Sequence, residues 1–71
     1  MTDPELVTAA IEAVTDGDVT AFAELLGHPH GRDVYAWRRG AVGLSTAVRA
    51  LLRVIVAHPR AMRRWLQEAQ P

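Results

Sequence analysis

The sequence predicts an all-α fold of five short helices. Apolar residues recur at the 3.6-residue spacing of a helix face in successive segments. Capping residues, glycine or proline separate these segments, as expected where one helix ends and the next begins. Val, Ile and Thr never alternate with polar residues as a half-buried strand requires, and there is no internal repeat or low-complexity tract. We therefore expect a single helical domain over residues 1–71.

Length and composition narrow the class of protein further. A chain of 71 residues is near the smallest size that folds around one core, so we expect a thin core and no second domain. An apolar content of 49% and a charged content of 23% are ordinary for a globular protein. The absence of cysteine excludes disulfides and thiolate sites, and is typical of a reducing compartment. With no basic leader and no apolar run of roughly 20 residues, we expect a cytoplasmic protein without a membrane segment.

The first two helices are bounded by clear signals. Pro4 suits the first helical position after Asp3, and the helix is expected from Pro4 to about Thr15, where Gly17 supplies a turn. Its apolar stripe consists of Leu6, Val7, Ala10, Ile11 and Val14. Asp18 is a suitable N-cap for a second helix from Val19 to Leu26, and Gly27 a left-handed stop. The inward residues of this helix are Val19, Phe22, Ala23 and Leu26.

The segment that follows begins with a turn and continues as a short helix. Proline and glycine in "HPHG" break the helical pattern over residues 28–31. A third helix from Arg32 to Arg39 would bury Val34 and Trp37, which are three residues apart. Its opposite face then carries Arg32, Tyr35 and Arg39, so that this face is basic and aromatic.

Two further helices complete the chain. Ser45 is expected to cap a fourth helix that runs through Ala57 and leaves Arg49 and Arg53 exposed. Its buried stripe is Val48, Leu51, Leu52, Ile55 and Val56. Pro59 then starts a fifth helix, over about 59–69, on which one face is shared by Met62, Trp65, Leu66 and Ala69.

Charge is distributed unevenly although the formal charges of the whole chain cancel. The first 24 residues hold only acidic charges: Asp3, Glu5, Glu12, Asp16, Asp18 and Glu24. The remainder holds all the basic charges, as Arg32, Arg38, Arg39, Arg49, Arg53, Arg60, Arg63 and Arg64, against Asp33 and Glu68. Such asymmetry favours a polyanion as partner, unless the fold mixes the two parts through internal ion pairs.

A short helix, a turn and a second short helix with Val and Trp inside and basic residues outside describe a helix-turn-helix motif over about 18–40. The segments "FAELLG", "VYAWRRG" and "LSTAVRALLRVIVAHP" resemble the Cro and C-repressor helix-turn-helix family, also called the xenobiotic-response-element family. The matching positions are Phe22, Ala23, Leu26, Gly27, Val34, Trp37, Arg39, Gly40, Ser45, Leu51, Leu52 and Pro59. The resemblance covers residues 19–59 and implies a lambda-repressor-like domain.

The resemblance also implies a function: binding of double-stranded DNA as a transcriptional regulator, most often a repressor, of the phage Cro or antitoxin type. The helix Arg32–Arg39 would enter the major groove. The DNA-binding residues would then be Arg32 and Tyr35 at base edges, and Arg38, Arg39 and Arg49 at phosphates. Family members generally bind near-palindromic operators as homodimers, and the expected dimer interface is Met62, Trp65 and Leu66.

Three features depart from the family pattern. The path from Gly27 to Val34 is one residue longer than usual, which shifts the positions near Arg32 that would face the bases. Arg38 stands where glutamate is common. Asp18 occupies a cap position where Thr or Ser often faces a phosphate, which a carboxylate would repel.

Other functions are weaker alternatives. The strongest is a protein-interaction module, such as an antitoxin bound to its toxin or an adaptor, which the acidic first helix favours. Zinc binding by His28 and His30 lacks a third ligand nearby. A hydrolase site built on Ser45, Asp33 and a histidine lacks a nucleophile elbow, and the chain is too short for a walled pocket, so we expect no enzymatic activity and no cofactor. The fourth helix could lie on a membrane surface, but its apolar stripe is better explained by packing against the other helices. Trp65 fits packing within the monomer and packing across a dimer equally well.

Overall fold

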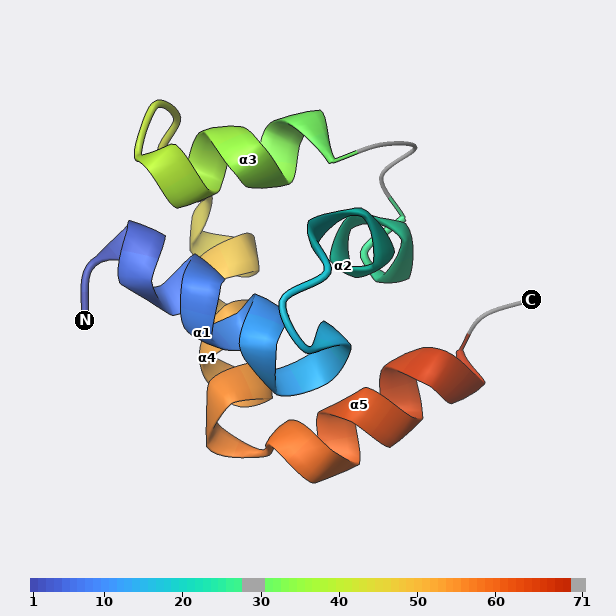
Figure 1. Ribbon diagram of the computed structural model, residues 1–71. Coiled ribbons are helices and arrows are strands. Elements are labelled where there is room, and N and C mark those ends of the chain that lie inside the picture. The colour runs from blue at the N-terminus through green and yellow to red at the C-terminus, as the bar shows by residue number, and fades with distance from the viewer. Residues whose placement is uncertain (28–30, 70–71) are drawn as a thin grey trace.

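α1 (Asp3–Thr15) is the central helix of the molecule. In the computed structural model, which describes residues 1–27 and 31–69, it contacts each of the other helices (Figure 1). These are α2 (Val19–Leu25), α3 (Arg32–Arg39), α4 (Thr46–Ala57) and α5 (Pro59–Glu68). The described residues contain these five helices and no strand, so the predicted all-α fold is confirmed.

The predicted helix bounds agree with the structure to within one residue at most ends. α1 begins at Asp3 instead of Pro4, because Thr2 is the N-cap. The Thr2 hydroxyl accepts from the Glu5 N–H at 3.3 Å and the Glu5 carboxylate accepts from the Thr2 N–H at 2.8 Å. This reciprocal capping box has a sequence signature, Thr followed three residues later by Glu, that the prediction overlooked.

The other predicted caps are confirmed. The Asp18 carboxylate accepts from the Ala21 N–H at 3.0 Å at the start of α2, and the Ser45 hydroxyl accepts from the Val48 N–H at 3.2 Å at the start of α4. α2 ends at Leu25, one residue before the predicted Leu26. Gly27 takes the left-handed conformation that was predicted for it, with φ of 83°.

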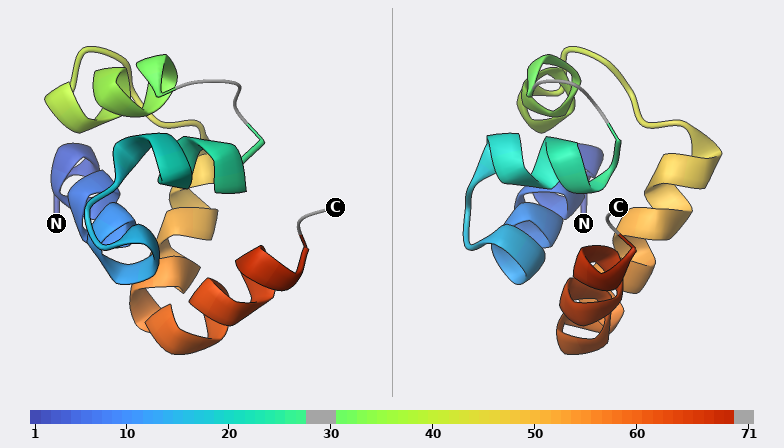
Figure 2. Two further views of the ribbon diagram at one scale, coloured as in Figure 1. Left: turned by 45° about the vertical axis from the view of Figure 1, so that its right-hand side comes forward. Right: turned by 90° about the vertical axis from the view of Figure 1, so that its right-hand side faces the viewer.

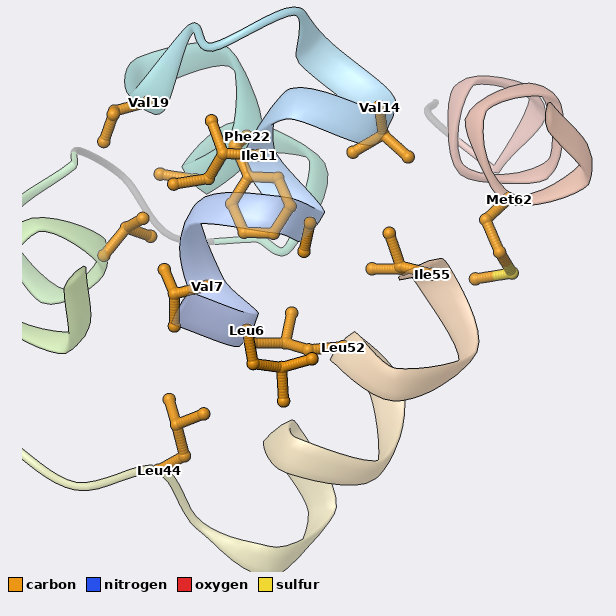
Figure 3. Packing of buried hydrophobic residues seen from close by; sticks show 13 residues of the cluster. Leu6, Val7, Ile11, Val14, Val19, Phe22, Leu44, Leu52, Ile55 and Met62 are labelled. Carbon is orange, nitrogen blue, oxygen red and sulfur yellow. The ribbon is translucent and has the colours of Figure 1, made fainter. Parts of the chain in front are cut away.

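The core lies between α1 and the helices that surround it. α1 contributes five buried side chains, and the neutral interior has no buried polar or charged residue among those described. Leu52 and Ile55 project from α4 toward α1, and Met62 projects from α5 toward α4 (Figure 3). The fully buried large side chains are Phe22, Ile11, Leu52, Ile55, Val7, Val14 and Val34. The fold thus has a thin core, built around one helix.

Several residues that were predicted to be buried are only partly buried in the structure. Trp37 and Leu26 are only partly buried, although both pack against the core. On α4, Leu52 and Ile55 are buried, whereas Val48, Leu51 and Val56 are at its edge. A helix at the surface of so small a domain has neighbours on one narrow side only, so the flanks of its apolar stripe keep solvent contact.

α3 lies at the edge of the molecule, against α1 and α2 (Figures 1 and 2). α2 is viewed almost end-on in Figure 1 while α3 runs across the view, so the two helices cross steeply. No described element covers the side of α3 that faces away from α1. The fold therefore presents α3 on an open face.

Candidate nucleic-acid interface

α3 forms between two glycines. It begins after Gly31, which supplies no side-chain cap, and ends at Gly40, which is left-handed with φ of 76°. The N–H groups of Gly40 and Ala41 donate to the carbonyls of Trp37 and Ala36, at 3.1 and 3.0 Å. These two bonds make a Schellman motif, which closes the end of the helix. The helix bounds Arg32–Arg39 are those predicted from the sequence.

Three of the four charges along α3 suit its dipole. Asp33 lies in the first turn, and Arg38 and Arg39 lie in the last. Negative charge at the amino end and positive charge at the carboxyl end both stabilise a helix. Arg32, in the first turn, is the exception.

α3 separates an apolar side from a basic side. Val34 is fully buried, and Trp37 packs partly buried against the core. The outward residues predicted from the sequence, Arg32, Tyr35 and Arg39, are all exposed. Trp37 was expected to be a core residue. It does pack against the core, but its side chain is partly buried and not fully buried.

Arg38 is also exposed, and its guanidinium lies over the ring of Tyr35, with Cζ 4.9 Å from the ring centroid. The sequence-based expectation gave these two residues separate roles, and their contact was not predicted. Their spacing of three residues on a helix is the signal that could have revealed it. Cation–π contacts of this kind are favourable even at exposed sites.

Arg49 departs from its predicted exposure. Its Nε and Nη2 atoms donate to the two carboxylate oxygens of Asp3 at 3.1 and 2.9 Å, and Nη2 also donates to the Leu44 carbonyl at 3.3 Å. About a third of each side chain stays exposed, 34% for Arg49 and 32% for Asp3. The prediction of an exposed Arg49 is therefore wrong, because this guanidinium joins α4 to the start of α1.

The ion pair with Arg49 shifts both pKa values. Hydrogen bonding from Arg49 lowers the pKa of the Asp3 carboxyl below its ordinary value, and hydrogen bonding to Asp3 raises the pKa of the guanidinium. Both shifts favour the charged forms. The predicted phosphate contact of Arg49 stays a prediction, and a phosphate would have to compete with Asp3 for the guanidinium.

A second ion pair joins α5 to the end of α1. Arg63 donates to the Val14 carbonyl at 3.2 Å and pairs with the Asp16 carboxylate at 2.6 Å. Together with the Asp3–Arg49 pair, this pair links the acidic first part of the chain to the basic second part. Such internal ion pairs were the alternative to a polyanion partner that the charge pattern left open.

The face predicted for α5 is divided in the structure. Met62 is buried at 8% exposure and Leu66 packs partly buried against the core, whereas Trp65 is 53% exposed. Met62 was predicted in a dimer interface and instead belongs to the interior of the monomer. Adjacent residues on a helix point in different directions, so Trp65 and Leu66 diverge. Trp65 is the residue of this group that a second molecule could reach.

The structure bears on the alternative functions that the sequence raised: a hydrolase site, a metal site and a membrane role. The Ser45 hydroxyl serves as the N-cap of α4. No group of three His, Cys, Asp or Glu side chains within residues 1–27 and 31–69 could hold a metal ion. The predicted turn over 28–30, with His28 and His30, lies outside the described residues. None of the helices described has the length and apolarity needed to cross a membrane.

Comparisons with models of known protein families, with curated proteins and with solved structures found no match to this chain.

Proposed function

We propose that this protein is a sequence-specific, double-stranded DNA-binding regulator that acts as a homodimer and occupies an operator, most simply as a repressor. The observation that carries the proposal is the open basic side of α3, where Arg32, Tyr35, Arg38 and Arg39 are all exposed. The resemblance of residues 19–59 to Cro-type regulators supports the same function.

The size of α3 fits the major groove. A helix with its side chains is about 10 to 12 Å across, and the groove is about 12 Å wide. With α3 lying in the groove, Arg32 in its first turn would meet base edges, since guanine offers two acceptors to a forked guanidinium. Arg39, in its last turn, would meet a phosphate of the backbone and set the position of the helix along the groove.

A homodimer follows from the small reading length of one helix. An eight-residue helix contacts too few base pairs to select one operator, whereas two copies on a near-palindrome double the contacts. The exposed Trp65 on α5 is the side chain we assign to the contact between copies. Aromatic side chains of this kind are enriched at interfaces.

The second candidate function is binding of a protein partner, such as a toxin. The observation that favours it is the acidic surface of the first part of the chain, where Glu5, Glu12, Asp18 and Glu24 are exposed. A basic partner could bind this surface while α3 remains open, so an antitoxin could also bind DNA.

Selection of bound duplexes from a random pool tests the proposed function. We expect enrichment of a near-palindromic site by the purified chain. Arg32→Ala and Arg39→Ala should each weaken binding to that site by about 1 to 3 kcal/mol, or roughly 5- to 150-fold. Arg64→Ala is the matched control, because Arg64 is an exposed arginine on α5.

The outcomes of this selection separate the two candidates. A pool that stays random would contradict sequence-specific binding. Equal losses from Arg32→Ala and Arg64→Ala would place the contact away from α3. A toxin that copurifies with the chain, together with a pool that stays random, would favour the protein-binding function.

A further inference from the structure

The Tyr35 side chain lies between two other residues of its own segment. On one side, a Cβ built on Gly31 would be only 3.3 and 3.4 Å from ring atoms Cε2 and Cδ2, so the ring edge covers the Gly31 backbone. On the other side, the Arg38 guanidinium lies 4.9 Å from the ring centroid. Gly31 is accordingly buried although it lies at the start of an edge helix. The ring is thus seated on Gly31 and supports Arg38.

The position of Arg38 on α3 limits what it can reach. Arg38 lies one helical turn after the buried Val34, on the flank of the helix next to its apolar side. Arg32, in the first turn, lies on the outward side instead. When a helix lies in the major groove, its outward side faces the base edges and its flanks face the walls of the groove, which are lined by phosphates.

The contact with Tyr35 leaves Arg38 able to bind a further group. Arg38 remains exposed while its Cζ lies over the ring, and its guanidinium carries five N–H donors in a planar fork that suits a phosphate. The contact also restricts a long side chain that is otherwise flexible, and less freedom is then lost on binding. An arginine held over the ring is therefore prepared for a phosphate.

We infer that Tyr35 is a positioning residue for Arg38: its ring holds the guanidinium on the flank of α3, where the N–H groups donate to a backbone phosphate, and its hydroxyl reads no base. The inference rests on the proposed function and replaces the sequence-based expectation that Tyr35 is a base reader. It also explains the value of arginine at position 38, because lysine lacks the flat face that stacks on a ring.

Four variants test the inference on the duplex selected by the wild-type chain. Tyr35→Phe keeps the ring, so its affinity should stay within about twofold of wild type. Arg38→Ala removes one charged hydrogen bond to a phosphate and should weaken binding about tenfold. Tyr35→Leu should weaken binding in the same direction, and the double variant Tyr35→Leu/Arg38→Ala should bind no more weakly than Arg38→Ala alone.

Two further measurements distinguish the loss of a contact from the loss of the fold: the salt dependence of binding and the proton chemical shifts of the protein without DNA. Arg38→Ala should lower the slope of log affinity against log salt concentration by about one, because one phosphate contact is lost. In the free protein, Arg38 side-chain protons should be shifted upfield by the ring current in wild type and in Tyr35→Phe, and not in Tyr35→Leu. The unfolding temperature of the Tyr35 variants should differ little from that of wild type, since the Tyr35 side chain is 43% exposed.

Distinct results would overturn this inference and the proposed function. If wild type binds and Tyr35→Phe loses as much affinity as Tyr35→Leu, the hydroxyl contacts DNA and the inference is wrong. If the losses from Tyr35→Leu and Arg38→Ala add in the double variant, the two residues act independently and the inference is again wrong. If wild type binds no duplex, the proposed function and the inference are both rejected.

Discussion

α1, with 13 residues, and α3, with 8, have opposite roles in the molecule. α1 contributes five buried residues and contacts every other described helix. α3 contributes one fully buried residue, Val34, and its exposed charges lie in its first and last turns. α1 therefore supplies more of the core than any other helix, whereas α3 is anchored to the core through Val34 and Trp37, and we expect its exposed charged side chains to contribute little to stability.

The difference shows how a very small domain can present a functional helix. With a thin core, the apolar side chains are concentrated on one central helix, and the edge helix is fixed by a few contacts at defined places. Val34 anchors the side of α3, while its two ends rest on neighbours: Gly31 lies against Val19, and Gly40 lies against Pro4. The remaining surface of α3 is left for a partner.

The largest effect should come from the central helix. Ile11→Ala removes a side chain that is 2% exposed and should lower the free energy of unfolding by about 2 to 5 kcal/mol. That is a large share of the roughly 4 to 10 kcal/mol expected for 71 residues. Chemical denaturation measures it. Ile11→Val is the control, with an expected loss of about 0.5 to 1.5 kcal/mol. Equal losses from both variants would contradict tight packing around α1.

A smaller effect should come from the junction between α3 and α1. Gly40→Ala forces a side chain into a left-handed conformation, at a cost of about 1 to 2 kcal/mol, and its Cβ would also approach Pro4 Cγ to 3.3 Å. Gly27→Ala carries the conformational cost alone, because a Cβ there meets no atom within 4 Å. Thermal unfolding should show the greater loss for Gly40→Ala. Equal losses would show that Pro4 moves aside without cost, and a greater loss for Gly27→Ala would contradict the prediction.

The Asp3–Arg49 pair should contribute less, because each side chain is about a third exposed. Since the pKa of Asp3 is lowered in the folded protein, the pair stabilises the fold above the ordinary carboxyl pKa, and this contribution is lost as pH falls through the lowered value. Asp3→Asn should therefore lower the unfolding temperature at neutral pH and make no difference at a pH below the lowered pKa of Asp3. Arg49→Gln should remove the same contribution, and a difference that persists unchanged at low pH would contradict the pairing.

The smallest effect on stability is expected on the outward side of α3. Arg39→Ala should change the free energy of unfolding by no more than about 0.5 kcal/mol, because Arg39 is exposed and outside the core. The same denaturation experiment measures it. A loss comparable to that of Ile11→Ala would mean that α3 supports the fold, and the contrast between the two helices would be lost.

Local signals in the sequence account for what could be predicted. Caps at Asp18 and Ser45, the stop at Gly27 and the bounds of α3 depend on residues close together in the chain, and all were predicted correctly. Contacts between distant residues could not be predicted in this way. Asp3 and Arg49 are 46 positions apart, so no periodicity links them, and their pairing depends on how α4 packs against α1.

How many residues of an apolar stripe are buried also cannot be predicted from the local sequence. Met62 and Trp65 share an apolar pattern on α5, yet one is buried and the other exposed, because the core reaches only one side of that helix. At the candidate interface, the exposure of Arg32, Tyr35 and Arg39 follows from the inward positions of Val34 and Trp37. The contact of Arg38 with the Tyr35 ring depends on side-chain conformation, which the three-residue spacing allows but does not determine.

The central claim is that the protein binds duplex DNA through contacts of its arginines with phosphates, and a salt titration tests it most directly. Affinity of the wild-type chain for duplex DNA should be measured from low to physiological ionic strength. We predict binding at low salt, with log affinity falling linearly against log salt concentration as phosphate counterions are released. Absence of binding at the lowest ionic strength, or affinity that does not depend on salt, would contradict the claim.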